Sequence, residues 1–196
     1  MELGSRKLPL DILEAGRTLY RIHPLDRGPI FFGPSPDRPL SGRWDAPDRS
    51  YGVCYLADAD HSYVAFAERF LREPGRTLVP ASALRHAGFA TLRLRRAVRV
   101  VRFHGSGLAR LGATAEITHG DHRGSRPWSL AVYRHLEAPG GIRWRARHDD
   151  DGLAVALFNR ERDALDVIQS VPLLSPGMVA QVGEWLDRYD LGVEEG

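Results

Sequence analysis

The sequence predicts a mixed α+β fold, and three kinds of pattern indicate it. Several short runs alternate apolar and polar residues, which is typical of strands with one wet face. The run Gly52-Val-Cys-Tyr-Leu-Ala57 is apolar, β-branched and aromatic and is bounded by turn residues, which favours a buried strand. Residues 178–189 instead place apolar side chains at helical spacing. With 196 residues, 43% of them hydrophobic, the chain can bury one sizeable core, so we expect a single domain over residues 1–196.

Two elements are expected before the first long loop. Residues 1–17 form an approach segment, with a short helix over residues 10–15. Thr18-Leu-Tyr-Arg-Ile-His23 then alternates apolar and polar residues as a strand does. Arg21 lies between two apolar residues of this strand.

A long loop is expected to connect this strand to the next one. Residues 24–40 are dense in proline and glycine, and irregular loops of this length inside a compact domain are often functional. The loop delivers Gly42-Arg43-Trp44. Cys54 lies inside the following strand, where we expect an inert buried thiol. A single cysteine excludes an internal disulfide and a thiolate-rich metal site.

The strand at residues 52–57 is followed by an expected helix that carries an acid on its apolar face. Asp58 or Asp60 can cap this helix by accepting from the free N–H groups of its first turn. Glu68 shares a face with apolar residues three and four positions before it. Burying an unpaired carboxylate is costly, so Glu68 needs a cationic partner or a task. Arg43 is the nearest candidate partner, and the alternative is a surface glutamate paired with Arg72.

The second half of the chain adds more strands and two helical stretches. A helical turn is expected near residues 105–112, and the amphipathic helix at 178–189 closes the core. Strands are expected at 90–95, 98–103, 141–146, 153–158 and 167–173. The arginines of the first two of these strands are expected on a wet face. A turn at 149–152 joins two of the later strands.

A polar loop runs from His119 to Pro127 and leads into another expected helix. Pro127 suits a first helical turn, and apolar residues follow at helical spacing. Ser129 would therefore lie near a helix N-terminus, where free backbone N–H groups favour anionic ligands. His119, Asp121 and His122 could be read as metal ligands, but no second ligand pair has matching spacing. We expect a solvated loop there and no metal.

Composition bears on location and on partners. The apolar runs are far shorter than the ~20 residues that a membrane span needs, and the first seven residues lack the apolar core of a secretory signal. We therefore expect a cytoplasmic protein with no membrane contact. A net charge of +2 is too small to suggest direct nucleic-acid binding. Nearly all basic residues are arginine, which reflects either genome composition or phosphate binding by planar guanidinium groups.

Five short blocks together resemble the RES-domain family, which is named after an arginine, a glutamate and a serine. The blocks are Tyr20-Arg21, Gly42-Arg43-Trp44, Tyr55-Leu-Ala57, Glu68 and Trp128-Ser129. The resemblance covers residues 18 to 175, with a C-terminal helix at about 175–190. Many members also carry a serine where this chain has Ala146.

The resemblance implies an ADP-ribosyltransferase-like α+β fold, with a split β-sheet core and flanking helices. It implies a toxin of a toxin–antitoxin pair that uses NAD⁺ as its substrate and needs no metal. The cognate antitoxin covers the active site. The activities that it implies are hydrolysis of NAD⁺, phosphorolysis of NAD⁺, or ADP-ribosylation of a protein such as a phosphoribosyl pyrophosphate synthetase.

Each matching residue receives a role from the chemistry. Cleavage of the nicotinamide–ribose bond passes through an oxocarbenium-like state, so we assign Glu68 to the ribose hydroxyls and the developing positive charge. Arg21 and Arg43 are expected to clamp the pyrophosphate through charge-assisted bonds and so to act in catalysis as well as in binding. Tyr55 would stack on the nicotinamide or brace the ribose. Ser129 would bond the nicotinamide amide or a phosphate.

Structural alternatives remain open for these residues. Arg21 could pair with an acid at the edge of the core, and Arg43 could be a turn arginine stacked on Trp44. Tyr55 could be a core tyrosine, and Ser129 a helix cap.

Three readings of the function follow. The leading one is an enzyme that cleaves NAD⁺ and transfers ADP-ribose to water, phosphate or a protein. The second is a strict protein mono-ADP-ribosyltransferase that modifies an enzyme of nucleotide metabolism. The third, motivated by Ala146, is a catalytically idle module that only binds a partner.

Overall fold

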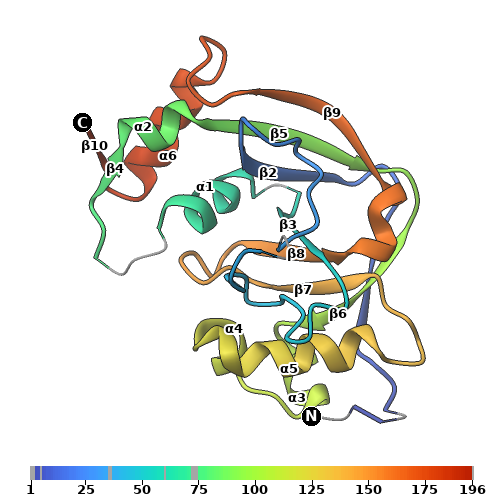
Figure 1. Cartoon of the computed structure of the whole chain (residues 1–196). Helices are drawn as coiled ribbons and strands as arrows, with labels where there is room; N and C mark the ends of the chain where they lie inside the picture. The colour runs from blue at the N-terminus through green and yellow to red at the C-terminus, as the bar shows by residue number, and fades with distance from the viewer. Residues whose placement is uncertain (1–2, 5, 35–36, 60, 72–74, 196) are drawn as a thin grey trace.

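The computed structural model describes residues 3–4, 6–34, 37–59, 61–71 and 75–195. These residues form an α+β fold around a large sheet (Figure 1). The strands are β1 (Leu10–Leu13), β2 (Thr18–Pro24), β3 (Val53–Ala57), β4 (Leu78–Pro80), β5 (Ala87–Leu94), β6 (Val98–Phe103), β7 (Gly141–Arg145), β8 (Leu153–Phe158), β9 (Leu165–Pro172) and β10 (Gly192–Glu194). The helices are α1 (Ser62–Phe70), α2 (Ala81–Arg85), α3 (Ser106–Leu111), α4 (Glu116–His119), α5 (His122–Tyr133) and α6 (Val179–Arg188), with the 3₁₀ helix η1 (Asn159–Ala164). None of the helices in the described residues is long and apolar enough to cross a membrane.

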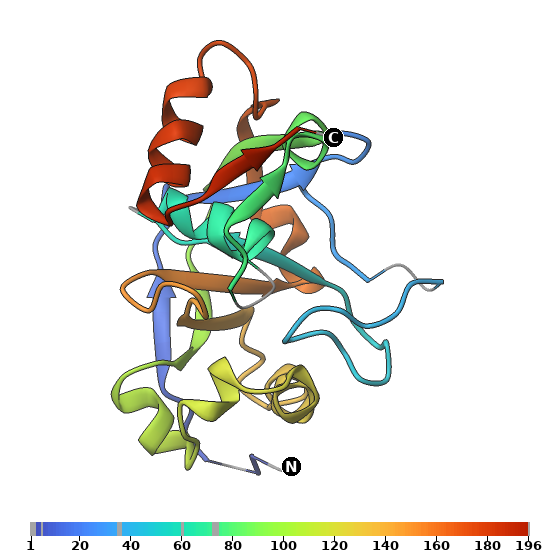
Figure 2. The same cartoon turned by 90° about the vertical axis from the view of Figure 1, so that its left-hand side faces the viewer.

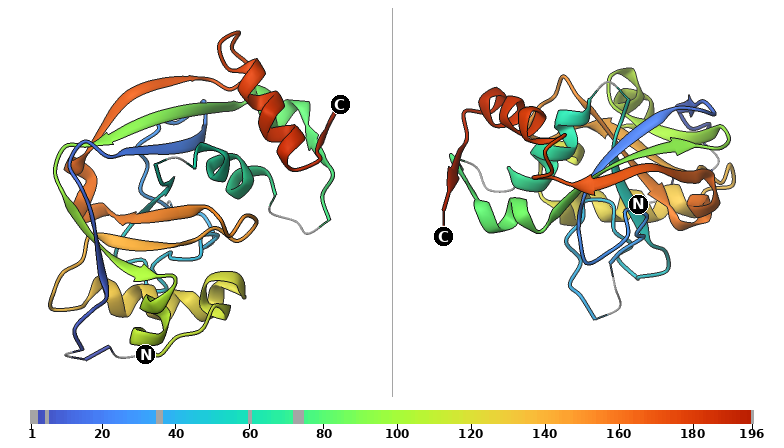
Figure 3. Two further views of the ribbon diagram at one scale, coloured as in Figure 1. Left: turned by 180° about the vertical axis from the view of Figure 1, so that it is seen from behind. Right: turned by 90° about the horizontal axis from the view of Figure 1, so that it is seen from above.

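The main sheet is split at one seam. Its strand order is β1-β6-β7-β8-β3-β2-β5-β9, and β2 meets β3 through the single pair Tyr20 and Ala57. On either side of this seam the pairing is extensive, because β2 pairs with β5 along its whole length and β3 does so with β8. The half-sheet of β2, β5 and β9 therefore diverges from the other half, and α1 lies between the two (Figures 1 and 3). The expected α+β class with a split sheet is confirmed.

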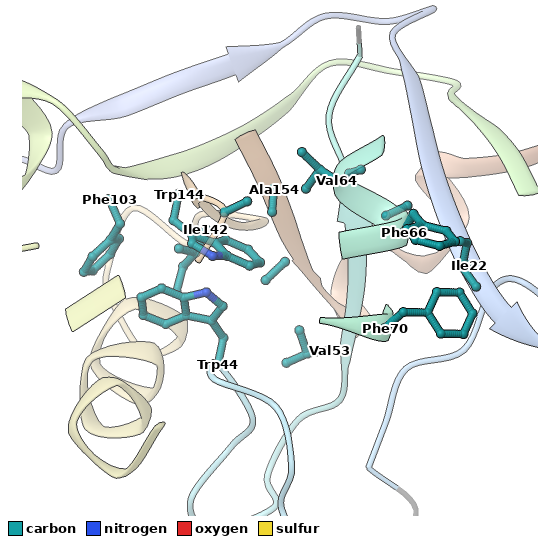
Figure 4. Close-up of a cluster of buried hydrophobic side chains, with 14 of the residues drawn as sticks. Ile22, Trp44, Val53, Val64, Phe66, Phe70, Phe103, Ile142, Trp144 and Ala154 are labelled. Carbon is teal, nitrogen blue, oxygen red and sulfur yellow. The ribbon is translucent and has the colours of Figure 1, made fainter. Parts of the chain in front are cut away.

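Two groups of aromatic contacts within one buried apolar cluster hold the elements in place. Trp44 is fully buried and packs against Phe103 and Trp144, which ties the loop after β2 to β6 and β7 (Figure 4). On the other side, Trp185 of α6 contacts Phe66 of α1. Burial of aromatic side chains of this size dominates core energetics. Residues 25–34 and 37–52, which include Trp44, extend to one side of the molecule (Figure 2).

The expected strands and most of the expected helices are present. The seven predicted strands correspond to β2, β3, β5, β6, β7, β8 and β9. Arg93, Arg95 and Arg99 are exposed, as expected, whereas Arg102 is half-buried and forms an ion pair with Asp11. The short elements β4, α2, α4, η1 and β10 were not predicted, because each is too short to show a period.

The prediction of a helix over residues 10–15 is wrong. Leu10–Leu13 is an edge strand that pairs antiparallel with β6, and only four residues are involved. Asp11 and Leu13 point inward while Ile12 is 58% exposed. The alternation is real, but four residues are too few to separate a strand from a helical turn.

Two predictions about helix starts are also wrong. The N-cap of α1 is His61, whose side chain makes no cap bond. Asp58 instead accepts from the N–H of Ala59 and from the side chains of Arg17 and Arg143. Asp60 lies outside the described residues. α5 begins at His122 because Asp121 caps it, accepting from the N–H of Arg123 at 2.7 Å. Ser129 therefore lies well inside α5 rather than at its start.

Candidate active site

A cavity of about 590 Å³ opens at the seam of the sheet. Its walls come from β2, β3, α1, the long loop after β2 and the turn between β7 and β8. Four of the five predicted site residues line it: Arg21, Arg43, Tyr55 and Glu68. Ser129 does not line it.

The cavity concentrates positive charge that the whole chain does not show. Six arginines line it against two carboxylates, although the net charge of the protein is only +2. The arginines are Arg21, Arg27, Arg38, Arg43, Arg69 and Arg147, and the acids are Asp45 and Glu68. A cleft lined by one sign of charge attracts ligands of the opposite sign, so the cavity favours an anion. Among the described residues, no group of three or more histidine, cysteine or acidic side chains could hold a metal ion.

Arg43 is a buried cation, and one nitrogen of its guanidinium group has no hydrogen-bond partner among the described residues. Its side chain is 5% exposed, and Nη1 donates to the carbonyl oxygens of Ile117 at 3.1 Å and Gly120 at 3.0 Å. Nη2 is buried and has no hydrogen-bond partner among the described residues. Burial lowers the pKa of Arg43, and the nearby carboxylate of Glu68 acts to raise it. A guanidinium held by carbonyls, with one nitrogen unsatisfied, is ready to bind an anionic group.

A clasp of hydrogen bonds fixes the turn that carries Arg43. Asp45 accepts from the backbone N–H of Ser41 at 3.1 Å and of Gly42 at 2.7 Å. The Tyr55 hydroxyl donates to Asp45 at 2.9 Å and accepts from the N–H of Trp44 at 2.8 Å. Burial and the adjacent Asp45 carboxylate raise the pKa of Tyr55 well above its usual value, so its hydroxyl stays protonated. The sequence did not single out Asp45.

Helix α5 lies along this turn and bonds to four successive carbonyls. The four side chains stand at positions i, i+3, i+4 and i+7 of the helix, which share one face. The pairs are His122 with Ser41 at 2.9 Å, Ser125 with Arg43 at 2.7 Å, Arg126 with Gly42 at 3.2 Å, and Ser129 with Trp44 at 2.6 Å. The segment 41–44 is thus held from α5 on one side and from Asp45 on the other. This polar spacing was the sequence signal that could have revealed the contact.

Ser129 belongs to this contact rather than to the cavity wall. Its side chain is fully buried, and its hydroxyl donates to the carbonyl of Trp44 while accepting from the Tyr51 hydroxyl at 2.6 Å. Both hydroxyl functions are therefore used within the protein. The structure gives it a place in positioning the segment before Asp45.

Glu68 of α1 and Arg21 of β2 both line the cavity. One carboxylate oxygen of Glu68 accepts from the backbone N–H of Arg147 at 3.1 Å, and Arg72, its alternative partner, lies outside the described residues. Nη1 of Arg21 donates to the carbonyls of Pro29 and Phe31, each at 3.0 Å, and lies 2.8 Å from Sγ of the buried Cys54. Arg21 therefore holds the long loop as well as lining the cavity.

Three histidines line the cavity, and none was predicted as a site residue: His23, His122 and His148. His122 and His148 are half-buried and line it. The pKa of each is lowered, first by burial and then by neighbouring arginines that include Arg43 and Arg147. Neutral imidazoles in a cavity that also contains a carboxylate and a buried guanidinium are suited to proton transfer.

Comparison with known proteins places this arrangement in a family. A model of the RES domain matches residues 18–176, which is most of the chain. No curated protein matches. A chain of the crystal structure of the M. tuberculosis MbcT–MbcA toxin–antitoxin complex has a TM-score of 0.65 with this one, covering 87% of this chain and 90% of that chain. At 20% sequence identity this likeness concerns the fold. The family match confirms the resemblance seen in the sequence, and the chain belongs to the RES-domain family.

Proposed function

We propose that this protein is the toxin of a toxin–antitoxin pair that cleaves the nicotinamide–ribose bond of NAD⁺ and transfers ADP-ribose to an acceptor. One observation carries the proposal. Arg43 lines the cavity together with Arg21 and Glu68, and it is buried and held by two carbonyls while its Nη2 has no hydrogen-bond partner among the described residues. Family membership supports the same substrate. The cavity volume, about 590 Å³, lies within the roughly 300–1,000 Å³ of small-molecule sites.

The groups of the cavity match the parts of a dinucleotide. Arg43 and Arg21 take the pyrophosphate, since planar guanidinium groups pair well with phosphate oxygens. Tyr55, whose hydroxyl is already used within the clasp, offers its ring, and Trp144 lines the cavity beside it at 6.3 Å between ring centroids. Glu68 takes the ribose hydroxyls.

The chemistry requires a carboxylate near the ribose. When the bond from C1″ to nicotinamide breaks, its electron pair goes to the pyridine nitrogen, which becomes neutral. The positive charge moves onto the ribose, where an anionic group stabilises it as in glycoside hydrolysis. Glu68 supplies that charge, and the backbone N–H of Arg147 orients its carboxylate. The acceptor is water, phosphate or a protein.

The partner belongs to the same proposal. The MbcT–MbcA structure is of a toxin–antitoxin complex, and this chain shares its fold with a chain of that complex. We infer a cognate antitoxin that covers the arginine-lined cavity, and action in the cytoplasm, where NAD⁺ is available.

The test is incubation of purified protein with NAD⁺ in phosphate and in phosphate-free buffer. Nicotinamide release by the wild type is expected, with strong loss in Arg43→Ala and Glu68→Gln. Arg95→Ala, which removes an exposed arginine that does not line the cavity, is the control and should keep wild-type activity. Masses of the products identify the acceptor: ADP-ribose, ADP-ribose 1″-phosphate or a modified protein. Absence of nicotinamide release by the wild type, or full activity in both site variants, would overturn the proposal.

A further inference from the structure

His122 is held in one tautomer at the cavity wall. It is the first residue of α5, and its Nδ1 lies 2.9 Å from the carbonyl oxygen of Ser41. A carbonyl oxygen can only accept, so Nδ1 carries the hydrogen. Nε2 is then the nitrogen with a free lone pair.

The orientation of the ring is fixed from behind. Ser41, which receives the bond from His122, itself donates its backbone N–H to the buried carboxylate of Asp45 at 3.1 Å. Ser125, one turn further along α5, bonds to the carbonyl of Arg43 at 2.7 Å. A base with a fixed tautomer and an orienting partner is the arrangement that general-base catalysis uses.

The charges around His122 keep it neutral. Burial is the main cause of its lowered pKa, and the positive charge of Arg43 on the facing turn is the next. The bond to the Ser41 carbonyl acts in the opposite direction. Arg126 of α5 and Arg147 of the β7–β8 turn lower the pKa further. Its place in the first turn of α5 also disfavours an added positive charge.

Acidic groups and two more histidines, His148 and His23, lie beside His122 or line the same cavity. Both ring nitrogens of His23 are already engaged, Nε2 with the Ser170 hydroxyl and Nδ1 with the carbonyls of Pro24 and Arg27. Asp121 caps the helix beside His122, and Glu68 and His148 line the same cavity. Asp121 is bonded to Arg123, which offsets its charge.

We propose that His122 is a further catalytic residue, the general base that takes a proton from a neutral hydroxyl acceptor. This rests on the proposed cleavage of NAD⁺. As nicotinamide leaves with the electron pair of the broken bond, the oxygen of water forms the new bond to C1″. The water proton passes to Nε2 of His122, which becomes an imidazolium and later releases the proton to solvent. Glu68 remains ionised and stabilises the ribosyl cation.

His148 is the competing candidate and lacks the orienting bond. No hydrogen-bond partner of its ring occurs among the described residues, so neither its tautomer nor its direction is fixed. Its neighbour Arg147 donates its backbone N–H to Glu68 at 3.1 Å. The geometry therefore favours His122.

The proposal predicts a loss that depends on the acceptor. His122→Asn keeps an amide N–H that can reach the Ser41 carbonyl but has no basic nitrogen. Hydrolysis of NAD⁺ in phosphate-free buffer should fall on the order of 10²-fold in this variant, chiefly in kcat. Phosphorolysis should change little, because the phosphate dianion brings an oxygen that needs no deprotonation. Added imidazole should restore part of the hydrolysis in His122→Ala.

The pH profile provides a second readout. Wild-type hydrolysis should decline only below the ordinary pKa of histidine, because the pKa of His122 is lowered and the ring must be neutral to act. This acid limb should be missing in His122→Asn. His86→Asn is the matched control, since Nδ1 of His86 also bonds a carbonyl, that of Ser82 at 2.7 Å, but the residue lies outside the cavity lining.

Failure of this proposal is distinct from failure of the proposed function. If the wild type releases nicotinamide but His122→Asn hydrolyses NAD⁺ at the same rate with the same acid limb, His122 is not the base. If His122→Asn lost hydrolysis and phosphorolysis equally, the role of His122 would be structural. If the wild type turned over NAD⁺ only in phosphate buffer, no general base would be needed. A defect confined to His148→Asn would transfer the role to that residue. No nicotinamide release by the wild type would instead overturn the proposed function.

Discussion

Removal of the Tyr55 hydroxyl should destabilise the protein even though the ring stays in place. In Tyr55→Phe two buried hydrogen bonds are lost: the bond to the Asp45 carboxylate at 2.9 Å and the bond from the Trp44 N–H at 2.8 Å. A bond to a charged group contributes about 1.5–3 kcal/mol and a neutral one about 0.5–1.5 kcal/mol. The free energy of unfolding should therefore fall by roughly 2–4 kcal/mol. Asp45 keeps its two bonds from backbone N–H groups, so the turn should loosen rather than unfold.

Urea unfolding followed by tryptophan fluorescence measures this loss. The midpoint should drop while the slope of the free energy with urea stays constant, since the area exposed on unfolding is unchanged. Tyr63→Phe is the control, because the Tyr63 hydroxyl has no hydrogen-bond partner among the described residues, and it should cost less than about 0.5 kcal/mol. A Tyr55→Phe variant as stable as the wild type but inactive towards NAD⁺ would refute the reasoning. Its hydroxyl would then contact substrate rather than hold the turn.

Three further predictions follow from the same contacts. In Gly42→Ala the new β-carbon would collide with the Tyr55 hydroxyl and the Asp45 carboxylate. Urea unfolding should show that the free energy of unfolding falls by about 1–3 kcal/mol. A variant with the same free energy of unfolding as the wild type would contradict the close packing at this position. In Arg43→Lys an ammonium cannot bond two carbonyls and a phosphate in one plane, so KM for NAD⁺ should rise at least about 10-fold, and an unchanged KM would remove Arg43 from the binding site. Burial acts to raise the pKa of Asp11, but hydrogen bonds from its basic partners outweigh burial and lower that pKa. The ionised Asp11 therefore stabilises the fold above the pKa of 3.8 that it has in the unfolded chain. This contribution to the free energy of unfolding is lost as pH falls through the lower pKa of the folded protein. Asp11→Asn should cost about 2 kcal/mol at pH 7, and the difference from wild type should vanish at the acid end of a pH series of urea melts.

The strands could be predicted because their signal is local. The run around Cys54 and the alternation from Thr18 to His23 each reflect burial of one face, which a short window of sequence records. Leu10–Leu13 was misread because its identity as a strand comes from pairing with β6, ninety residues away. The start of α5 was missed because Pro127 was taken as a first-turn signal although Asp121 supplies the cap. In each case a distant or competing contact overrode a local preference.

The site residues also divide into those that the sequence revealed and those that only the folded structure shows. Arg21, Arg43, Tyr55 and Glu68 were found because their sequence blocks resemble those of a family, and the structure brings all four to one cavity. Nothing local in the sequence revealed that Asp45 closes a clasp with Tyr55, because that tyrosine becomes its neighbour only when the turn folds back on β3. Hydrogen-bond partners of this kind have to be read from the folded chain.

The energetics of Arg43 explain why so many contacts converge on residues 41–45. A buried donor without a partner costs about 1–3 kcal/mol, so the turn would tend to move until Nη2 found a protein acceptor. The α5 bonds to successive carbonyls and the Asp45 clasp prevent that movement. The unsatisfied nitrogen then stays on a residue of the cavity wall, where we expect an incoming anion to relieve its cost. Preorganised donors of this kind contribute more to binding and catalysis than mobile ones. The contacts that hold the turn rigid should therefore increase the affinity for an anionic ligand.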